Sequence, residues 1–291
     1  MRILVFGAGG MLGHKVIQAF TPDSEVWGTV RGSFADIADY DFLNESHCIG
    51  AVDITEESST RRAVEAAGPQ VVINAIGIVK QQPLAKNVIA TLTVNSIFPH
   101  RLSQLSDEFG FRLITISTDC VFDGKKGGYT ERDTPNPTDL YGKSKELGEV
   151  VNGRALTIRT SIIGRELAGS HGLVEWFLSN RDKPVNGFQK AIYSGFPTID
   201  LADIIRHLVF DLPELNGLYH VSSDPINKYD LLKLVNKYFE ANITIEPSDQ
   251  LQIDRSLDSS RFRDATGFVP KTWEEMIQRM AADPTPYDKW R

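Results

Sequence analysis

Cysteine is scarce in this sequence, with only Cys48 and Cys120 among 291 residues. Two cysteines do not suggest a disulfide framework or a zinc site, so we interpret both as reduced thiols. An excess of basic residues is also missing, because 31 Lys and Arg stand against 38 Asp and Glu, for a net charge of −7. Since a nucleic-acid-binding surface needs clustered positive charge, we expect no nucleic-acid partner.

Long hydrophobic runs are absent as well. The apolar run Ile3–Phe6 is too short for a signal peptide or a membrane span, and no later segment reaches ~18 uninterrupted apolar residues. We therefore expect a cytoplasmic protein with no membrane partner. Hydrophobic residues make up 41% of the chain, which is enough to build a sizeable core at this length.

Short apolar segments alternate with amphipathic ones along the first two thirds of the chain. The strands are expected at 2–6, 25–30, 70–74, 112–117, 155–159 and 217–221, and the helices at 11–20, 58–67, 89–109 and 141–151. This alternation predicts an α/β fold with a doubly wound parallel sheet. We expect residues 1–160 and 196–222 to form a nucleotide-binding Rossmann domain, and residues 161–195 and 223–291 a smaller C-terminal α/β lobe for the substrate.

A glycine-rich turn follows the first predicted strand and opens the first helix. Its glycines are Gly7, Gly10 and Gly13, with Met11 and Leu12 between the last two. Glycines allow a sharp turn and close approach of the backbone to a pyrophosphate, while the helix start supplies N–H groups and partial positive charge. We interpret the turn as a dinucleotide site; a strand-to-helix turn without a ligand is the alternative.

The residue after the second strand indicates the choice of cofactor. An NAD site usually has a carboxylate there for the ribose hydroxyls, whereas this chain has Arg31, which suits a 2′-phosphate, with Ser33 nearby. Asp53 and Ile54 are candidates for the adenine border. We therefore expect NADP(H); an exposed surface Arg31 and an Asp53 that only opens a turn are the alternatives.

A catalytic constellation lies further along the chain. Ser117 and Thr118 end a predicted strand, and Tyr141 and Lys145 are spaced to share one face of a helix. A neighbouring ammonium favours the tyrosinate, so we expect Lys145 to lower the Tyr141 pKa and make the hydroxyl an effective acid–base group. Thr118 would hydrogen-bond the same substrate oxygen.

Together these motifs resemble the extended short-chain dehydrogenase/reductases. Within them the chain is similar to the sugar-nucleotide reductases of the dTDP-4-dehydrorhamnose reductase type. The resemblance rests on the glycine turn, Asn74-Ala75-Ile76-Gly77, Val94-Asn95, the segment Ser117-Thr118-Asp119-Cys120-Val121-Phe122-Asp123-Gly124, Tyr141-x-x-x-Lys145 and Arg159-Thr160-Ser161.

The resemblance implies an NADPH-dependent reduction of a 4-keto-6-deoxysugar nucleotide, as in polysaccharide biosynthesis. The catalytic residues would be Thr118, Tyr141 and Lys145, and Lys145 would also hold the nicotinamide ribose. The remaining cofactor residues would be Ala75, Ile76, Gly77, Asn95 and Ser117. The chain departs from the family at Cys120, where an aromatic residue is usual, and after Ser161, where an expected aromatic residue is missing. We expect no metal ion.

Four residues are candidates for the nucleotide-sugar substrate: Lys80, Trp176, Arg255 and Arg261. The cations would pair with a diphosphate and the indole ring would stack on a base or sugar. Core packing or a solvated surface position is the alternative for each. His220 lies in a predicted strand, where we expect a structural role.

Two other functions remain open. A redox-neutral dehydratase or epimerase of the same superfamily is one, although dehydratases typically carry a second carboxylate after Asp119, where this chain has Cys120. The other is a non-catalytic NADP-binding regulatory subunit, like the beta subunit of methionine adenosyltransferase. The sequence is compatible with a monomer or a homodimer.

Overall fold

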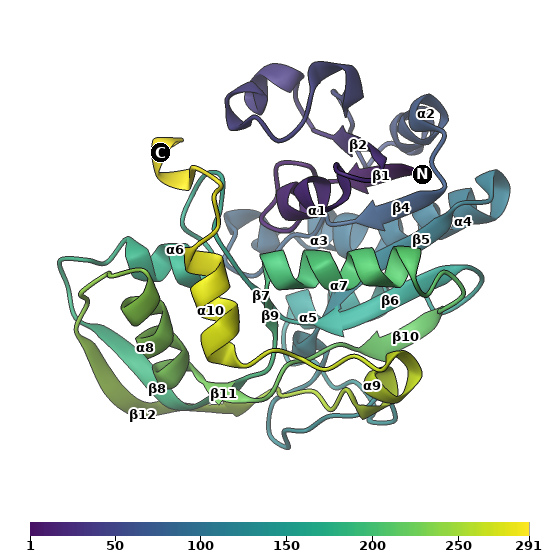
Figure 1. Ribbon diagram of the computed structural model, residues 1–291. Helices are drawn as coiled ribbons and strands as arrows, with labels where there is room; N and C mark the ends of the chain where they lie inside the picture. Colours follow the sequence, from purple (N-terminus) through teal and green to yellow (C-terminus); the bar gives the residue numbers. More distant parts are fainter. Residues whose placement is uncertain (291) are drawn as a thin grey trace.

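A seven-stranded sheet organises the larger part of the protein. The computed structural model describes residues 1–290, and the strands lie in the order β10-β6-β5-β4-β1-β2-β3 (Figure 1). All neighbouring strands in this sheet are parallel. Their bounds are β1 (Arg2–Phe6), β2 (Glu25–Thr29), β3 (Cys48–Ile49), β4 (Val71–Asn74), β5 (Arg112–Thr118), β6 (Ala155–Thr160) and β10 (Gly217–His220). The expected doubly wound parallel sheet is confirmed, and its strand order reverses between β1 and β4.

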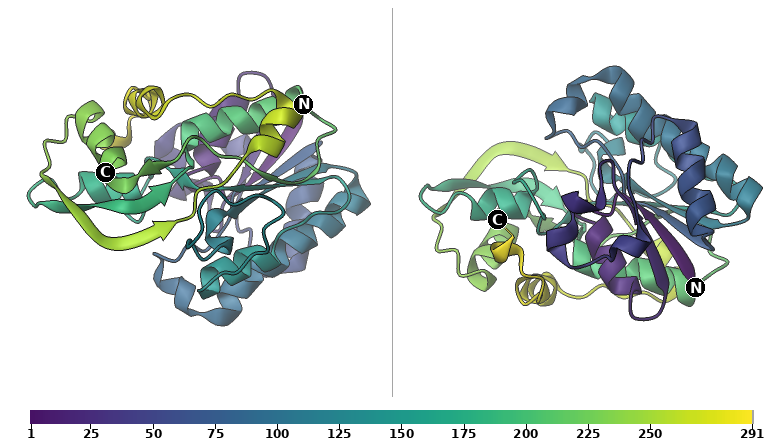
Figure 2. Two further views of the ribbon diagram at one scale, coloured as in Figure 1. Left: turned by 90° about the horizontal axis from the view of Figure 1, so that it is seen from below. Right: turned by 90° about the horizontal axis from the view of Figure 1, so that it is seen from above.

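Alternate residues of β1 face two helical layers. Ile3 and Val5 join the apolar cluster that contains α1 and α7, whereas Leu4 and Phe6 join the cluster that contains α2 and α4. Because successive side chains of a strand point to opposite faces, a continuous apolar strand must be covered on both sides. The first layer comprises α1 (Gly13–Phe20) and α7 (Thr198–Phe210), and the second α2 (Glu57–Ala67), α3 (Val88–Leu92), α4 (Phe98–Phe109) and α5 (Leu140–Leu147) (Figure 2).

The helix predicted over 89–109 is interrupted by a π-helical turn. Helix α3 ends at Leu92, residues Thr93–Ile97 form the turn, and α4 begins at Phe98. Pro99 lacks the N–H that a regular helix would donate to the carbonyl oxygen of Asn95, four residues earlier. The single predicted helix is therefore wrong in this stretch, and the local change of register places Asn95 beside the next helix, α5.

Helix α5 ends earlier than the predicted 141–151. Its last residue is Leu147, and a Cβ atom on the following Gly148 would collide with the carbonyl oxygen of Asn95. Close packing of two backbones requires glycine here. Asp139 caps the other end, because its carboxylate accepts a hydrogen bond of 2.8 Å from the N–H of Gly142.

A second, three-stranded sheet forms the smaller part of the molecule. Its order is β11-β8-β12, with β11 (Ile226–Asn227) antiparallel and β12 (Ile245–Asp254) parallel to β8 (Val185–Tyr193). The helices α6 (Leu173–Leu178), α8 (Lys228–Tyr238) and α10 (Trp273–Ala281) surround it (Figure 1). A short pair of strands, β7 (Ile162–Ile163) and β9 (Phe196–Pro197), lies where the chain passes into and out of this part.

Two segments within the range 223–291 pack against the larger sheet and its helices instead. Helix α9 (Ser260–Thr266) contacts β10. The segment 283–290 covers α1, where the buried pair Lys15–Asp283 is 2.6 Å apart and the hydroxyl of Tyr287 lies 2.7 Å from Nε2 of His14. The C-terminal segment thus holds the helix that follows the glycine turn. Within residues 1–290, no helix combines the length and apolar character that a membrane span requires.

Candidate active site

The turn after β1 brings its glycines into close contact. Gly7 has a φ of 91°, a left-handed conformation that glycine adopts without strain. A Cβ atom on Gly13 would collide with the carbonyl oxygen of Gly7, and the N–H of Gly10 donates to the same oxygen over 3.0 Å. The turn itself therefore requires glycine at its two ends.

The amino end of α1 is suited to an anion. Its cap residue Leu12 makes no side-chain capping hydrogen bond, and the first turn contains no acidic residue. The first N–H groups of a helix have no intrahelical partner and carry partial positive charge, so they attract a phosphate. Ala75 and Ile76 lie against Gly7, since a Cβ atom there would come within 2.9 Å of the Ile76 side chain. A cradle at the point where the strand order reverses fits the pyrophosphate of a dinucleotide.

Arg31 lies just beyond the carboxyl end of β2. Its side chain is exposed and lies within electrostatic range of Asp53. The N–H of Ser33 donates to Asp36 over 2.9 Å, which caps a short 3₁₀ turn. Arg31 remains the candidate partner for a 2′-phosphate, while the backbone of Ser33 already serves the local turn.

Asp53 and Ile54 have structural contacts. The Asp53 carboxylate accepts hydrogen bonds from the N–H and the hydroxyl of Thr55, at 2.9 and 2.7 Å, which hold its pKa below the usual range. Ile54 is buried in the apolar cluster beneath α2. Asp53 thus opens a turn, as the alternative from the sequence had it, and its contact with adenine stays a prediction.

Thr118, Tyr141 and Lys145 converge at the carboxyl end of β5. Thr118 is the last residue of that strand, and its hydroxyl hydrogen-bonds Tyr141 from the first turn of α5. The Lys145 ammonium, one turn further along α5, donates to the carbonyl oxygen of Ile116 over 2.6 Å. The Tyr141 side chain keeps part of its surface exposed, so a ligand can reach it. The structure brings the predicted triad together; its catalytic role remains a prediction.

Burial, and not the neighbouring ammonium, dominates the pKa of Tyr141. Burial raises the pKa of the hydroxyl, and Cys120 and Asp119 act in the same direction, whereas the hydrogen bond with Thr118 opposes them. Burial also lowers the pKa of Lys145 to about 8. The expectation of a lowered Tyr141 pKa is therefore wrong for this structure, because desolvation disfavours the tyrosinate and the ammonium is engaged by a backbone carbonyl.

Asn95 holds the loop after β4 against α5. Its Oδ1 accepts from the N–H of Ile78 at 2.9 Å, and its Nδ2 donates to the Ile78 carbonyl at 2.9 Å and to the Ser144 hydroxyl at 3.0 Å. The Ser144 hydroxyl donates to the carbonyl oxygen of Tyr141. The side chain of Asn95 is 1% exposed and its amide is used in these contacts, so it positions the loop after β4 against α5. A contact of Asn95 with the cofactor stays a prediction.

Ser117 belongs to a buried network on the other side of β5 from Thr118. Its hydroxyl donates to Glu149 over 2.6 Å. Glu149 accepts two hydrogen bonds from Arg159, at 2.7 and 2.6 Å, and Arg159 also lies 3.2 Å from Nε2 of His220. The Ser117 side chain faces away from Thr118, because neighbouring residues of a strand face opposite sides of the sheet, and a contact of Ser117 with the cofactor stays a prediction. The structural role expected for His220 is confirmed.

Two of the predicted substrate residues approach the same thiol. The Nζ atom of Lys80 lies 3.9 Å and the Nη1 atom of Arg255 3.8 Å from Sγ of Cys120. Arg255 is held in place by a hydrogen bond of 2.8 Å from its Nε to the carbonyl oxygen of Phe122. Burial raises the pKa of Cys120 to about 11, so the thiol is protonated at neutral pH. Both cations therefore lie near Cys120, two residues after Thr118.

The other two candidates lie elsewhere. The guanidinium of Arg261 sits 4.4 Å from the centre of the Tyr219 ring and donates to the carbonyl oxygen of Leu218 over 3.0 Å. These contacts fix it on the edge strand β10, outside the group around Cys120. Trp176 is 39% exposed on α6, while its neighbour Phe177 is fully buried in the core. Stacking of Trp176 on a substrate stays a prediction.

Sequence reasoning missed Lys228. It is the first residue of α8 and lies within electrostatic range of Lys80, Asp119, Cys120 and Arg255. The sequence did contain an indication of Lys228: a lysine at the start of a helix is disfavoured by the positive end of the helix dipole. An unfavourable charge at such a position points to a use other than stabilising the helix.

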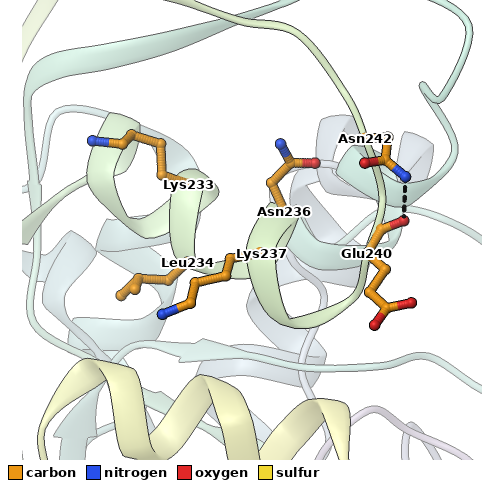
Figure 3. Close-up of a pocket in the computed structure, with 6 residues that line it drawn as sticks. All are labelled: Lys233, Leu234, Asn236, Lys237, Glu240 and Asn242. Carbon is orange, nitrogen blue, oxygen red and sulfur yellow. Dashed lines mark hydrogen bonds between the residues drawn. The ribbon is translucent and has the colours of Figure 1, made fainter.

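A depression of about 680 Å³ lies between α8 and the loop that follows it (Figure 3). Lys233 and Lys237 line it, but they pair with Asp230 and Glu274 at 3.4 and 2.7 Å. It is lined by none of the residues around Cys120. We therefore do not assign it to the active site.

Comparison with known proteins identifies the family. Residues 1–285 match the family described as the RmlD substrate binding domain. The chain belongs to this family. It is 24% identical over 310 residues to the dTDP-4-dehydrorhamnose reductase of Aggregatibacter actinomycetemcomitans, a match that covers 97% of this chain and 98% of the relative.

Two further comparisons bear on this RmlD-family chain. It is 32% identical over 149 residues to methionine adenosyltransferase 2 subunit beta of Danio rerio, covering 51% of this chain but only 42% of that protein. Its fold resembles the dTDP-4-dehydrorhamnose reductase of Bacillus anthracis, solved in complex with NADP, with a TM-score of 0.80, 23% identity and coverage of 97% and 99% of the two chains. The predicted family and Rossmann-type fold are confirmed.

Proposed function

We propose that this protein uses NADPH to reduce the keto group of a 4-keto-6-deoxysugar nucleotide. The observation that carries the proposal is the meeting of Thr118, Tyr141 and Lys145 at the carboxyl end of β5. The similarity to a dTDP-4-dehydrorhamnose reductase over nearly the full length of both chains supports it. The assignment of the substrate as a 4-keto-6-deoxysugar nucleotide is part of this proposal.

The reaction transfers a hydride to the carbonyl carbon and a proton to its oxygen. NADPH supplies the hydride when bound. The proton comes from the Tyr141 hydroxyl, and the raised pKa keeps this group in its acid form at neutral pH. Thr118 hydrogen-bonds the same substrate oxygen, and the Lys145 ammonium opposes the negative charge that proton transfer leaves on Tyr141. A solvent proton then restores the phenol.

The cofactor would be held along the edge of the sheet where the strand order reverses. The start of α1, with Met11 and Leu12, would receive the pyrophosphate, and Arg31 the 2′-phosphate. Gly77 and its neighbours after β4 would line the nicotinamide side. Lys145 would hold the nicotinamide ribose.

The test is a screen of NADPH oxidation, followed at 340 nm, against a panel of 4-keto-6-deoxysugar nucleotides. Tyr141→Phe removes the proton donor and keeps the ring, so we expect kcat to fall by ~10²–10⁴-fold while NADPH affinity is retained. Tyr238→Phe, whose hydroxyl contacts Glu274 on the outside of α8, is the matched control and should leave kcat unchanged. Near-normal turnover in Tyr141→Phe contradicts the mechanism.

A regulatory role is the second candidate, and the similarity to methionine adenosyltransferase 2 subunit beta is what favours it. A protein that binds NADPH, oxidises none of it with any sugar nucleotide, and forms a complex with a methionine adenosyltransferase in analytical ultracentrifugation would support this candidate over the reductase. A redox-neutral dehydratase is less well supported, because the protonated Cys120 thiol cannot replace the second carboxylate as a base.

A further inference from the structure

A buried histidine lies directly behind the glycine turn. His14 is the second residue of α1, and its side chain is completely buried. Its Nδ1 atom lies 2.8 Å from the carbonyl oxygen of Gly10, and its Nε2 atom lies 2.7 Å from the hydroxyl oxygen of Tyr287. A buried imidazole is costly unless its nitrogens have partners, and here both have one. The proposed reduction uses no group of this side chain.

These contacts determine which nitrogen carries the proton. A carbonyl oxygen can only accept a hydrogen bond, so Nδ1 is the protonated atom of the neutral His14 ring. Nε2 then accepts from the hydroxyl of Tyr287, a residue of the C-terminal segment that is 3% exposed. Burial raises the pKa of Tyr287, so the phenol keeps the proton that it donates. The imidazole is therefore oriented from one side by Tyr287 and donates to Gly10 on the other.

The carbonyl of Gly10 belongs to the same peptide unit as the N–H of Met11. In a planar trans peptide the C=O and N–H bonds point in opposite directions. The Gly10 carbonyl points into α1, where it also accepts from the N–H of His14 over 3.2 Å. The N–H of Met11 consequently points out of the start of the helix. Within residues 1–290 it has no hydrogen-bond partner, and Met11 is partly exposed, so a ligand can reach it.

The imidazole is the stronger of two restraints on this peptide unit. Its hydrogen bond to the Gly10 carbonyl measures 2.8 Å, whereas that from the backbone N–H of His14 measures 3.2 Å. A typical N–H···O bond is about 2.9–3.0 Å long, so the backbone bond by itself is a weak one. Gly9 and Gly10 are both exposed, and glycine has the widest backbone freedom. The side chain of His14 therefore limits the rotation of a peptide unit that its own sequence leaves mobile.

We propose that His14 is a positioning residue that holds the Gly10–Met11 peptide with the Met11 N–H aimed at the pyrophosphate of NADP(H). The proposal rests on the proposed function, which has the pyrophosphate at the start of α1. A peptide unit already held in its bound orientation loses less conformational freedom when the cofactor binds, so preorganisation raises affinity. His14 acts through the backbone from within the core.

Two amide substitutions separate the contacts of the imidazole. The Nδ2 atom of His14→Asn takes the place of the ring Nδ1 and can still donate to Gly10. The Nε2 atom of His14→Gln takes the place of the ring Nε2 and meets Tyr287 instead. In calorimetric titrations with NADP⁺, His14→Gln should bind about 2- to 10-fold more weakly than the wild type, the effect of one neutral hydrogen bond, whereas His14→Asn should retain the wild-type affinity.

The matched control is Gln18→Met on the same helix. It removes a hydrogen bond of 3.1 Å between α1 and Thr285 of the C-terminal segment, but no contact with the glycine turn, so NADP⁺ affinity should be unchanged. A melting temperature well above the titration temperature shows that each variant is folded. If His14→Gln does not fold, His14→Leu, which removes both contacts of the ring, takes its place with the same expected loss.

The Met11 amide gives a readout that a general loss of stability would not move. The chain contains four methionines, so protein labelled with ¹⁵N-methionine gives few backbone amide signals, and Met11→Leu identifies the signal of Met11. Saturating NADP⁺ should shift this signal in the wild type and in His14→Asn, and by a smaller amount in His14→Gln. Equal shifts in the two variants contradict the positioning role.

The outcomes separate the positioning role from the proposed function. If no sugar nucleotide is reduced but NADP⁺ binds more tightly to His14→Asn than to His14→Gln, the positioning role stands and the reductase activity does not. If the enzyme is active but His14→Asn binds NADP⁺ no more tightly than His14→Gln, the positioning role is overturned. A wild-type protein that binds no NADP⁺ overturns both. In an active enzyme, His14→Gln should raise the KM for NADPH and leave kcat at saturating NADPH unchanged.

Discussion

The acid sensitivity of this protein should depend on His14. This side chain is completely buried in α1, where its Nδ1–H donates to the carbonyl oxygen of Gly10 over 2.8 Å. Its Nε2 lies 2.7 Å from the hydroxyl of Tyr287. Because a carbonyl can only accept, the neutral ring carries its proton on Nδ1 and accepts a hydrogen bond from Tyr287 at Nε2. Protonation of Nε2 removes its capacity to accept this hydrogen bond and places a charge in a fully buried site.

The size of the effect follows from the pKa of His14. Burial lowers it from 6.5 to about 4, and the nearby Lys15 ammonium acts in the same direction. At pH 5 the unfolded chain therefore binds a proton at His14 that the folded protein does not. Linkage predicts that the free energy of unfolding decreases by ~2 kcal/mol when the pH is lowered from 7 to 5. The unfolding equilibrium constant then rises by a factor of ~30. The stability contributed by the neutral ring is fully present above pH 6.5 and is lost toward pH 4.

Urea unfolding at pH 7 and pH 5, followed by tryptophan fluorescence, measures this loss. His14→Gln cannot titrate, so its loss of stability between the two pH values should be smaller than that of the wild type by ~2 kcal/mol. His171→Gln, at an exposed position, is the control and should show the wild-type loss. If His14→Gln and the wild type lose the same stability, the neutral buried ring is not the source of the acid sensitivity.

Three further substitutions test the cofactor site. Lys145→Ala should weaken NADPH binding as well as turnover, since the ammonium serves both ribose and Tyr141; an NADPH dissociation constant like that of the wild type removes the ribose role. Arg31→Ala should weaken NADPH by ~10- to 150-fold and spare NADH, because a charged hydrogen bond contributes ~1.5–3 kcal/mol. Because Arg31 is exposed to solvent, the loss of NADPH affinity should lie toward the lower end of this range. If the wild-type protein binds NADH as tightly as NADPH, the assignment of Arg31 to the 2′-phosphate is refuted. Gly13→Ala places a Cβ atom on the Gly7 carbonyl and should lower both the melting temperature and NADPH affinity; a variant that retains both would show that the turn can relax.

The order of motifs along the chain was enough to predict the fold and the central part of the site. Gly7 follows β1, Ala75 follows β4 and Thr118 ends β5. Because the carboxyl ends of parallel strands meet at one edge of a sheet, residues at these ends come together regardless of the conformation of the connecting loops. The spacing of Tyr141 and Lys145 likewise predicted a shared helix face.

The direction of the Ser117 side chain could have been predicted from the sequence. If Thr118 faces the site, strand alternation requires the Ser117 side chain to face away from it, and the structure shows its hydroxyl bonded to Glu149. The π-helical turn around Asn95 was harder to predict from the sequence. Pro99 alone is compatible with the start of a regular helix, because proline is common in the first turn of helices. The consequence of the π-helical turn depends on Gly148, more than fifty residues later, packing against the Asn95 carbonyl.

Tertiary structure alone decided the electrostatics of the site. Spacing brings Lys145 near Tyr141, but the pKa of each depends on desolvation, which is set by what the remaining chain covers. Lys80 and Arg255 are separated by a long stretch of sequence, and both approach the Cys120 thiol only because of the way the chain folds. Local periodicity determines which strands and helices form, whereas burial and long-range charge proximity depend on how those elements pack.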